Sequence, residues 1–475
     1  MNLIHKTLIG LMALTISSCN DWLDVQPTSQ VEDTELFSSE SGYKEALSGV
    51  YSSMVSENTY TKELLFGAIG VLGHEWDTYP ATTYQDFANY DYSTTYPTSI
   101  IAAIWSTSYN SIANVNNLLQ HIDDSQHLFT FNNYNIIKGE ALALRAFLHF
   151  GLLRCFGVSY AQNSQMPSIP FCTELTYRVS PQLTVEQVAN RIEQDLLEAS
   201  ELLKVDPIYT GETITELDDN GYLMNRQVHL NYYAVKGLMA RLYMWMQRYE
   251  DARSCAQEVI DSELFPWTDP TDMAAGNDYT CASEHLFALN NVNLSTLADN
   301  YFNIDSSTNT FSLSSATLLD YFDQSTTDYR YLYLFVSGEG NTGELTDYRF
   351  LAKYMTPSSS DNYYINKMPL IKIGEMYLIV SECNYRLNGT GLDELNELRQ
   401  ARNVLPLENL PGDYYTELIH EYRREFIGEG QLFFLYKRLN RENIIGSDVN
   451  MITSRAYTFP LPLSETEASQ RENNR

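Results

Sequence analysis

The chain has 475 residues, 44% of them hydrophobic and 19% charged, which is typical of a folded protein with a substantial core. Thirty basic residues against 61 acidic residues give a formal net charge of −31 at pH 7. Coulomb repulsion from this charge disfavours nucleic acid and anionic surfaces, so neither is expected as a partner. The length allows about three ordinary domains or one long repeat architecture.

The first 18 residues have the three parts of a secretory signal. A cationic start at His5 and Lys6 precedes an apolar run from Leu8 to Ile16, and the small residues Ser17 and Ser18 follow it. The apolar run is shorter than the roughly 20 residues that a membrane-spanning helix needs. No later stretch is comparable, so we expect no transmembrane helix.

Cys19 ends this signal in the manner of a bacterial lipoprotein. The residues Ile16-Ser17-Ser18-Cys19 are similar to a lipobox, with Ile and Ser where Leu and Gly or Ala are more usual. We therefore predict a signal peptide over residues 1–18, lipid (palmitate-type acyl chains) on Cys19, and a tether over residues 19–40. More than one acyl chain gives stable anchoring, because each buried CH₂ contributes only about 0.8 kcal/mol. The alternative is an ordinary secreted protein with a cysteine at this place by chance.

The remaining cysteines show neither close pairs nor the spacing of metal ligands. We expect them to be small buried apolar residues, with one disulfide as the alternative. No metal and no cofactor is predicted. These residues are Cys155, Cys172, Cys255, Cys281 and Cys383.

From residue 41 onwards, most of the chain has apolar residues at helical spacing, which predicts a mostly α fold in a single domain over residues 41–475. Helices are expected over residues 41–54, 100–122 and 134–156, the first with Ser41 as a candidate N-cap. A fourth helix begins after Thr184. Gln187 lies three residues further on, so the two residues can form a capping box.

Residues 229–266 contain the clearest sign of an internal repeat. Two helices of similar length are joined by a turn at residues 247–249, with small and aromatic residues on the facing sides. This pattern is similar to a tetratricopeptide unit. Further helix pairs are expected over residues 100–156 and 371–402, the second turning at residues 388–391. The alternative is a helical domain without repeats.

Two regions lack a sustained period and are rich in Tyr, Asn, Ser, Thr, Asp and Gly: residues 70–96 and residues 264–369. We predict that they are loop-rich insertions with short strands over a helical scaffold. Binding residues lie more often on such loops than on the elements that support them, so function is expected here.

Motifs of catalysis are missing from the sequence. There is no His-Glu-x-x-His, no Gly-x-Ser-x-Gly and no phosphate-binding Gly-rich loop. No catalytic residue is therefore predicted, and the protein is not expected to be an enzyme. The one dense polar and aromatic cluster, residues 74–77 (His-Glu-Trp-Asp), allows three interpretations: an acid/base site, part of a binding loop, or a structured loop.

Aromatic residues make up 13% of the chain, and 35 of them are tyrosines. Flat rings with a polar tip suit carbohydrate, because a pyranose face stacks on the ring while its hydroxyls bond to neighbouring polar groups. Aromatic residues in the predicted helices, such as Trp105 and Trp245, are expected in the core. The predicted ligand-binding residues are those of the two loop-rich regions: Trp76, Asp77, Tyr79, Tyr84, Trp267 and Tyr301.

Five segments spread over nearly the whole chain form one larger pattern. They are Cys19–Pro27, Arg145–Gly157, Ile371–Leu378 with Glu382, Arg424–Gly430 with Lys437 and Arg438, and Phe459–Pro462 with Glu465. As a set and in this order, they resemble the SusD/RagB-like nutrient-uptake lipoproteins of the Bacteroidetes outer membrane. Leu432 and Leu435 stand where many members carry Arg and Asp, which suggests a subgroup. We expect Arg424, Glu425, Glu429 and Arg438 to form ion pairs at a packed helix end rather than a ligand site.

The resemblance implies four tetratricopeptide-like units with a variable, loop-rich half that forms the binding surface. It also implies a partner, a TonB-dependent SusC-like barrel in the outer membrane, over which the lipoprotein acts as a lid facing the exterior. The resulting hypothesis is capture of a nutrient oligosaccharide without cleavage and its delivery to the barrel. The alternatives are peptide capture, as in the RagB branch, a secreted hydrolase, and a purely structural scaffold.

Overall fold

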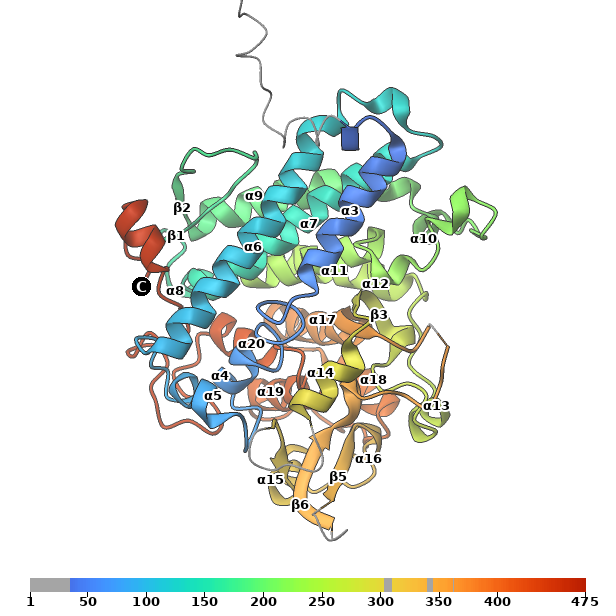
Figure 1. The fold of residues 1–475 in the computed structure, drawn as a ribbon. Helices are drawn as coiled ribbons and strands as arrows, with labels where there is room; N and C mark the ends of the chain where they lie inside the picture. Colours follow the sequence, from blue (N-terminus) through green and yellow to red (C-terminus); the bar gives the residue numbers. More distant parts are fainter. Residues whose placement is uncertain (1–34, 303–309, 340–344, 362) are drawn as a thin grey trace, which may run out of the picture.

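The computed structural model describes residues 35–302, 310–339, 345–361 and 363–475. Helices account for 54% and strands for 8%, so the predicted mostly α fold is confirmed. Long helices fill one part of the molecule, and short helices and strands gather at the opposite end (Figure 1). The predicted signal peptide, Cys19 and the tether up to residue 34 lie outside the described residues.

The four helices predicted from the first half of the chain are present. They are α3 (Glu40–Met54), α6 (Thr95–Ile122), α7 (Asn133–Phe156) and α9 (Val185–Leu202). The capping box of α9 is confirmed: the Gln187 amide donates to Thr184 Oγ1 at 3.2 Å, and the Thr184 amide donates to Gln187 Oε1 at 3.0 Å. The cap of α3 is Ser39 rather than Ser41, because Ser39 Oγ accepts the Gly42 amide.

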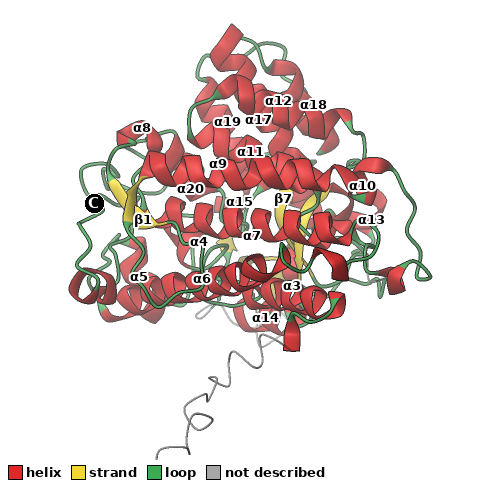
Figure 2. Ribbon diagram, turned by 90° about the horizontal axis from the view of Figure 1, so that it is seen from above, coloured by secondary structure: helices red, strands yellow, loops and turns green. Residues whose placement is uncertain are grey.

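The second half of the chain supplies the predicted helix pairs. They are α11 (Tyr232–Trp245) with α12 (Tyr249–Asp261), and α17 (Ile373–Asn388) with α18 (Leu392–Ala401). Each helix of the series α6, α7, α9, α11, α12, α17 and α18 packs on the next. Figure 2 shows α6, α7 and α11 as successive rows of this stack. The stacked antiparallel helices are the repeat architecture that the sequence indicated.

Shorter elements cover the ends of the stack. The helices are α4 (Ala68–Leu72), α5 (Ala81–Ala88), α8 (Tyr160–Asn163), α10 (Pro207–Thr210), α13 (Pro270–Ala274), α14 (Leu294–Tyr301), α15 (Ser315–Tyr321), α16 (Tyr329–Tyr333), α19 (Tyr414–Glu425) and α20 (Leu432–Arg438). The strands are β1 (Pro167–Pro170), β2 (Gln182–Thr184), β3 (His285–Asn290), β4 (Leu313–Ser314), β5 (Phe335–Glu339), β6 (Leu345–Leu351) and β7 (Lys367–Lys372). All strand pairs are antiparallel: β1 pairs with β2, β3 pairs with β7, and β6 pairs with both β4 and β5.

The two predicted loop regions differ in their structure. Most of β3 to β7 falls within residues 264–369, so the expected short strands are present there. Residues 70–96, by contrast, are only partly loop, because they contain the end of α4, all of α5 and the start of α6. Helix α5 has only eight residues, too few for its apolar spacing to stand out in the sequence, and it buries Tyr84 and Phe87.

Glycines join the C-terminal part of the chain to the segment before α4. Gly428 and Gly430 have φ of +76° and +67°, which side chains other than glycine rarely adopt. A Cβ on Gly430 would lie 2.2 Å from the carbonyl oxygen of Leu64. This close approach explains the glycines of the segment Arg424–Gly430 and holds residues 62–66 in place.

The predicted C-terminal ion pairs are confirmed, and they are buried. Glu425 binds Arg402 at 2.8 Å, and Arg424 binds Glu421 at 2.9 Å. Lys353 lies 2.6 Å from a carboxylate oxygen of Glu429. In the same way, Arg438 lies 2.6 Å from Glu382. The Arg424–Glu421 pair lies within α19, whereas the other three pairs join distant parts of the chain.

The helices of the described residues do not meet the requirements for crossing a membrane. Among the described residues, no helix combines the length and the apolar character that crossing a bilayer requires.

The five cysteines of this part of the chain are all free thiols, four of them buried and Cys172 half-buried. The prediction that they are small packing residues is therefore confirmed.

Candidate ligand-binding surface

Three of the predicted ligand-binding aromatics meet around one ring, that of Phe311. The centroid of Phe311 lies 5.8 Å from Trp76, 5.4 Å from Tyr84 and 6.2 Å from Tyr301. Phe66 joins the same cluster, 5.8 Å from Tyr301. Segments separated by more than 200 residues thus come together at the C-terminal end of α14.

Trp76 and Tyr84 lie beneath this surface rather than on it. Their side chains are only 6% and 2% exposed. The indole N–H of Trp76 donates to the carbonyl of Phe66 at 2.9 Å, and the Tyr84 hydroxyl donates to Glu63 at 3.0 Å. Both rings were predicted to bind ligand from a loop-rich region, whereas tertiary packing makes them part of the core. Direct ligand contact is therefore expected from the more exposed residues.

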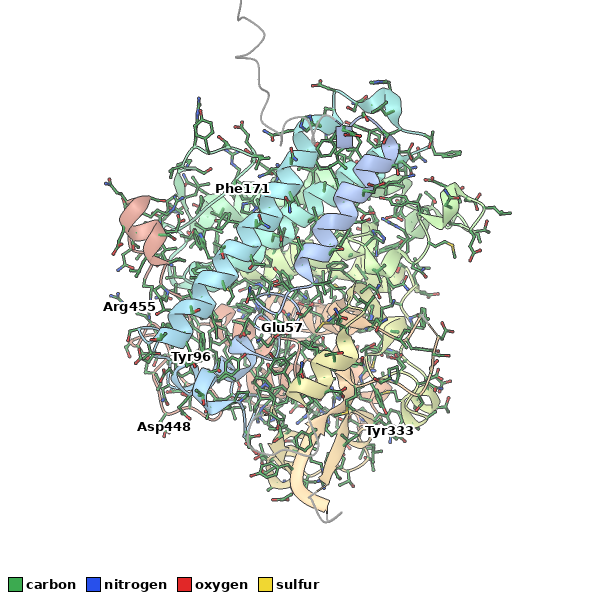
Figure 3. All side chains as sticks on the ribbon, viewed as in Figure 1. Glu57, Tyr96, Phe171, Tyr333, Asp448 and Arg455 are labelled. Atoms are coloured by element: carbon green, nitrogen blue, oxygen red, sulfur yellow. The ribbon has the colours of Figure 1, made fainter. Side chains whose placement is uncertain are left out.

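The outer part of the cluster is formed by Glu57, Lys62 and Tyr301, which we call the Tyr301 surface; Glu57 is exposed, and Lys62 and Tyr301 are half-buried. The Tyr301 hydroxyl donates to Glu57 Oε2 at 2.6 Å, and Lys62 Nζ donates to the Tyr301 oxygen at 3.1 Å. Lys62 also pairs with Glu57 at 2.9 Å and lies 4.9 Å from the centre of the Tyr301 ring. Figure 3 labels Glu57 close to α14. An aromatic ring, a cation and a carboxylate are thus held together at the surface.

The charges of the Tyr301 surface are fixed by its own contacts. Burial opposes the charged form of Lys62, but Glu63, Glu57 and Tyr301 outweigh it and raise the Lys62 pKa. Burial likewise opposes ionisation of Glu57, yet Tyr301 and Lys62 lower the Glu57 pKa below its usual value. Burial, followed by the bond to Glu57, raises the pKa of Tyr301. At neutral pH the surface therefore presents an ammonium, a carboxylate and a protonated phenol.

Asp77 and Tyr79 lie on the strand-like segment that continues this surface. Thr78 between them forms an isolated bridge with Ser312. Asp77 is exposed, and its Oδ2 accepts the Ser314 amide at 2.8 Å; Tyr79 is half-buried. The Phe311 amide in turn donates to the Tyr301 carbonyl at 2.8 Å, so the segment that pairs with Asp77 and Thr78 also contacts the backbone of Tyr301.

A cavity of about 120 Å³ opens at the other end of α14. All of its lining residues come from the predicted loop-rich region 264–369, and they include Tyr279, Ser295, Tyr364 and Asn366. Tyr364, which lines this cavity, and its neighbour Tyr363 were not among the predicted ligand-binding residues. The signal that identifies them is an aromatic pair within the polar stretch Ser358–Asn366. Together with the Tyr301 surface, this cavity makes α14 the centre of the candidate site.

Trp267 stands apart from this group. Its ring lies 5.0 Å from Tyr377 and 5.1 Å from the guanidinium carbon of Arg402, and the side chain is half-buried. Trp267 is therefore held by α17, through Tyr377, and not by the Phe311 cluster. Its predicted role in ligand binding is independent of that of Tyr301.

The cluster at residues 74–77 has the geometry of a structured loop. Glu75 is fully buried, and its Oε2 accepts the Gly428 amide at 2.8 Å. Burial raises the pKa of Glu75 to about 8. A carboxyl group packed behind Trp76 has no access to a ligand at the surface, so it holds the loop in place.

Within the described residues, one group has the spacing of cation ligands: Asp323, Glu417 and His420. Arg424 already pairs with Asp323 and lies 3.7 Å from Glu417. The guanidinium therefore supplies the positive charge that the two carboxylates require, and the group does not fit a metal ion.

The fold and this surface define a helical-repeat protein with a loop-rich, aromatic half. Two family models match the chain in succession, one described as starch-binding associating with outer membrane over residues 21–213, the other as SusD family over residues 270–473. The chain belongs to the SusD family.

Curated relatives and solved structures agree with this assignment. A SusD-like protein of Formosa agariphila is 24% identical over 277 residues, 56% of this chain and 47% of that protein; the match spans about half the length of such relatives. A SusD superfamily protein from Bacteroides thetaiotaomicron has a TM-score of 0.70 at 20% identity, with 92% of this chain and 100% of that chain covered. Surface glycan-binding protein A from Bacteroides uniformis has a TM-score of 0.69 at 19% identity, covering 92% and 99%. At these identities the structures establish the shared fold.

Proposed function

We propose that this protein is a lipoprotein, anchored through Cys19 and facing the exterior of the outer membrane, that captures a nutrient oligosaccharide without cleaving it. It delivers the oligosaccharide to a TonB-dependent, SusC-like barrel. The observation that carries the proposal is the Tyr301 surface, where a partly exposed ring lies beside Lys62 and Glu57. A pyranose face can stack on such a ring while its hydroxyls bond to the flanking charges.

The chemistry of this surface favours capture over cleavage. A glycosidase needs one carboxyl group that keeps its proton near neutral pH and acts as the acid. Tyr301 and Lys62 instead lower the pKa of Glu57, which makes Glu57 a poor proton donor. The names of related proteins, a surface glycan-binding protein and a SusD-like carbohydrate binding protein, support the same class of ligand.

Capture and release set the affinity that the function requires. Dissociation constants between micromolar and millimolar, about −8 to −4 kcal/mol, retain a ligand at the surface and still let it pass to a transporter. Three contacts around one partly exposed ring suit this range better than a deep, enclosed site.

Calorimetry of the purified protein against a panel of oligosaccharides, starch-derived ones included, tests the proposal. We expect binding of at least one member, weakened by Tyr301→Ala. Binding of peptides in place of all the glycans would support the RagB-like alternative, and shortened products after incubation would support a hydrolase. Co-purification of a barrel protein from native membranes, lost when this chain is absent, tests the delivery step separately.

A further inference from the structure

Arg154 on α7 is a buried cation without a carboxylate partner. Its side chain is 6% exposed, and Nη1 donates to Gln431 Oε1 at 3.2 Å, while Nε has no hydrogen-bond partner. No Asp or Glu within the described parts of the chain forms an ion pair with it. The guanidinium carbon lies 4.2 Å from the ring centre of Phe434 and 5.1 Å from that of Phe150. Aromatic faces attract a cation, but they do not neutralise its charge.

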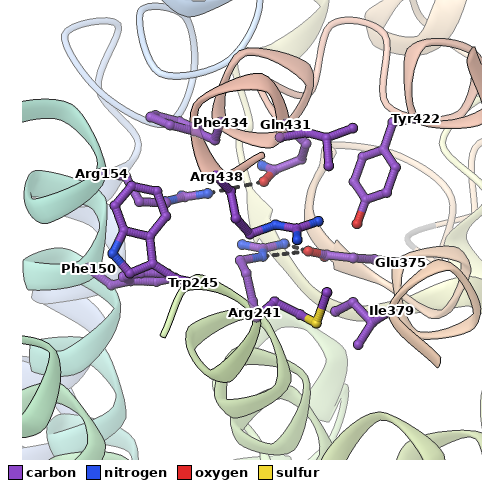
Figure 4. A pocket seen from close by; sticks show the side chains of 12 residues that line it. Phe150, Arg154, Arg241, Trp245, Glu375, Ile379, Tyr422, Gln431, Phe434 and Arg438 are labelled. Carbon is purple, nitrogen blue, oxygen red and sulfur yellow. Dashed lines mark hydrogen bonds and ion pairs between the residues drawn. The ribbon is translucent and has the colours of Figure 1, made fainter. Parts of the chain in front are cut away.

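Positive charge is in excess around Arg154. Figure 4 shows the guanidinium groups of Arg154, Arg241 and Arg438 pointing into one space from three helices, α7, α11 and α20. Arg241 donates to Glu375 at 2.7 Å, and Arg438 donates to Glu382 at 2.8 Å. Glu382 is shared with a further cation, Arg386, at 2.8 Å. The group therefore contains four guanidinium groups and two carboxylates.

Lys437 adds to this excess. It is fully buried, and its Nζ donates to the backbone carbonyls of Arg154 and Tyr457, each at 2.6 Å, with no carboxylate in contact. Burial lowers the Lys437 pKa to about 7, and the charge of Arg154 contributes to this shift. Burial, with Arg241 nearby, likewise lowers the pKa of Arg154 to about 10. Both shifts are those of cations that lack a counter-charge.

The side chains around Arg154 enclose a cavity of about 30 Å³, which we call the Arg154 cavity. This volume suffices for one water molecule or a monatomic ion and excludes a sugar ring. Burying an unpaired charge costs several kcal/mol, so a group that supplies a negative charge at this place stabilises the folded protein.

We propose that the Arg154 cavity binds a small monovalent anion of the size of chloride. The anion would accept from Arg154 and lie among the guanidinium groups of Arg241 and Arg438, restoring the local charge balance. Because α7 and α11 belong to the repeat stack and α20 to the C-terminal part, its binding joins the two halves of the fold. This site is separate from the Tyr301 surface, and the proposal does not depend on the proposed function.

Thermal unfolding of the purified full-length protein in chloride and in gluconate, at equal ionic strength, tests the proposal. Equal ionic strength keeps general screening constant. An anion that binds only the folded state raises Tm with the logarithm of its concentration, by roughly 2–3 °C at 100 times its Kd for a chain of this length. We expect this increment with chloride and bromide and not with gluconate, which is too large for the cavity.

Substitution identifies the residue responsible. Arg154→Met should remove the chloride increment, whatever its effect on Tm in gluconate. Arg145→Met is the matched control, since Arg145 lies on the same helix but is paired with Asp195 at 2.7 Å. It should lower Tm and keep the increment. An increment that persists in Arg154→Met, or is missing from the wild type, would overturn the proposal.

Crystals of the wild-type protein grown in bromide give a result that does not depend on a variant folding. We expect an anomalous peak beside Arg154 Nε. Density for water there, without anomalous signal, would show that a neutral molecule fills the cavity and that the anion proposal is wrong.

Discussion

Lys62 Nζ donates a hydrogen bond of 3.1 Å to the hydroxyl of Tyr301, although 239 positions separate the two residues in the chain. Lys62 is held in turn by Glu63 at 3.2 Å, and Glu63 accepts from the buried hydroxyl of Tyr84. The polar face of the candidate site therefore rests on the core. This arrangement fixes the orientation of the Tyr301 ring before any ligand arrives, which reduces the entropy lost on binding.

Substitutions at Tyr301 separate the ring from its hydroxyl. Loss of a stacking ring costs about 1–1.5 kcal/mol of binding free energy, so Tyr301→Ala should weaken oligosaccharide binding roughly tenfold. Tyr301→Phe keeps the ring and should lose less affinity. Calorimetry measures both. Tyr96→Ala, at a tyrosine that is 47% exposed near the start of α6, serves as control. If all three variants bind like the wild type, Tyr301 is not at the binding site.

Trp76 and Trp267 should respond differently to replacement by alanine. Trp76 is buried against Phe302 and Phe311, so Trp76→Ala should cost about 3–5 kcal/mol of stability, seen as a lower denaturant midpoint. Trp267 is half-buried, so Trp267→Ala should cost less stability than Trp76→Ala. If Trp267 contacts the ligand, Trp267→Ala lowers affinity without a comparable loss of stability. Equal stability of Trp76→Ala and the wild type would contradict the buried position of Trp76.

Local patterns were sufficient to predict most of the helical scaffold. Helix α9 has apolar residues at a spacing that a helix places on one face, and its Thr184–Gln187 capping box lies within four residues. Helices α7 and α11 are buried on nearly all sides, and their long apolar stretches indicated them. Helix α5 was missed, since two turns carry too few apolar positions to define a period. Short elements depend on their tertiary surroundings more than on their own sequence.

The site was less predictable than the scaffold for a physical reason. Trp76 and Tyr301 look alike in sequence, as aromatic residues among polar neighbours, and only the packing of Phe311 and α14 decides which of them is buried. Lys62 gave no signal, because its role comes from a residue 239 positions away. Composition can identify the kind of side chain that binds a sugar, but not which of them share a surface.

Glu75 should make the stability of the protein depend on pH. Burial raises its pKa in the folded state to about 8, whereas an unfolded glutamate has a pKa near 4.3. The fold therefore prefers the protonated group: its contribution is complete below about pH 4.3 and is lost as the pH rises to about 8, with an effect on the order of 5 kcal/mol. Glu75→Gln cannot ionise and should be more stable than the wild type at pH 8.5.

Unfolding curves from pH 4.5 to pH 8.5 measure this effect. The difference in stability between Glu75→Gln and the wild type should grow in favour of the variant as the pH rises, because only the wild type loses stability when the carboxyl group ionises. Glutamine keeps an oxygen that can accept the Gly428 amide. Glu57→Gln, at an exposed and ion-paired carboxylate, is the control and should show no such growth. A constant difference between Glu75→Gln and the wild type across this range would mean that Glu75 is ionised throughout.

The buried ion pairs around Glu425 should matter far more than those at the surface. Arg402 is 1% exposed and binds both Glu284 and Glu425. Among the described residues, Arg402→Met leaves the buried Glu284 without an ion pair and Glu425 with only Arg330 and Lys372, so it should cost about 3–5 kcal/mol. Arg248, with a side chain 40% exposed, binds Glu193 and Asp251, and Arg248→Met should cost below about 1 kcal/mol. Denaturant unfolding compares the two variants, and similar losses would argue against a structural role for the buried network.

Cys19→Ala tests whether anchoring and binding are separate in the proposed function, in which the lipid anchors the protein and the folded part binds the oligosaccharide. Cys19 lies outside the described residues and far in sequence from the Tyr301 surface, so the purified variant should bind the oligosaccharide with unchanged affinity. Growth on that oligosaccharide should nevertheless fail, because a protein released from the membrane cannot stay beside its transporter. A variant such as Tyr301→Ala, which keeps the anchor, should show the opposite pattern: normal membrane attachment with weakened binding. Loss of affinity in Cys19→Ala would show that the anchor region takes part in binding, and unimpaired growth would show that the lipid is not needed for delivery.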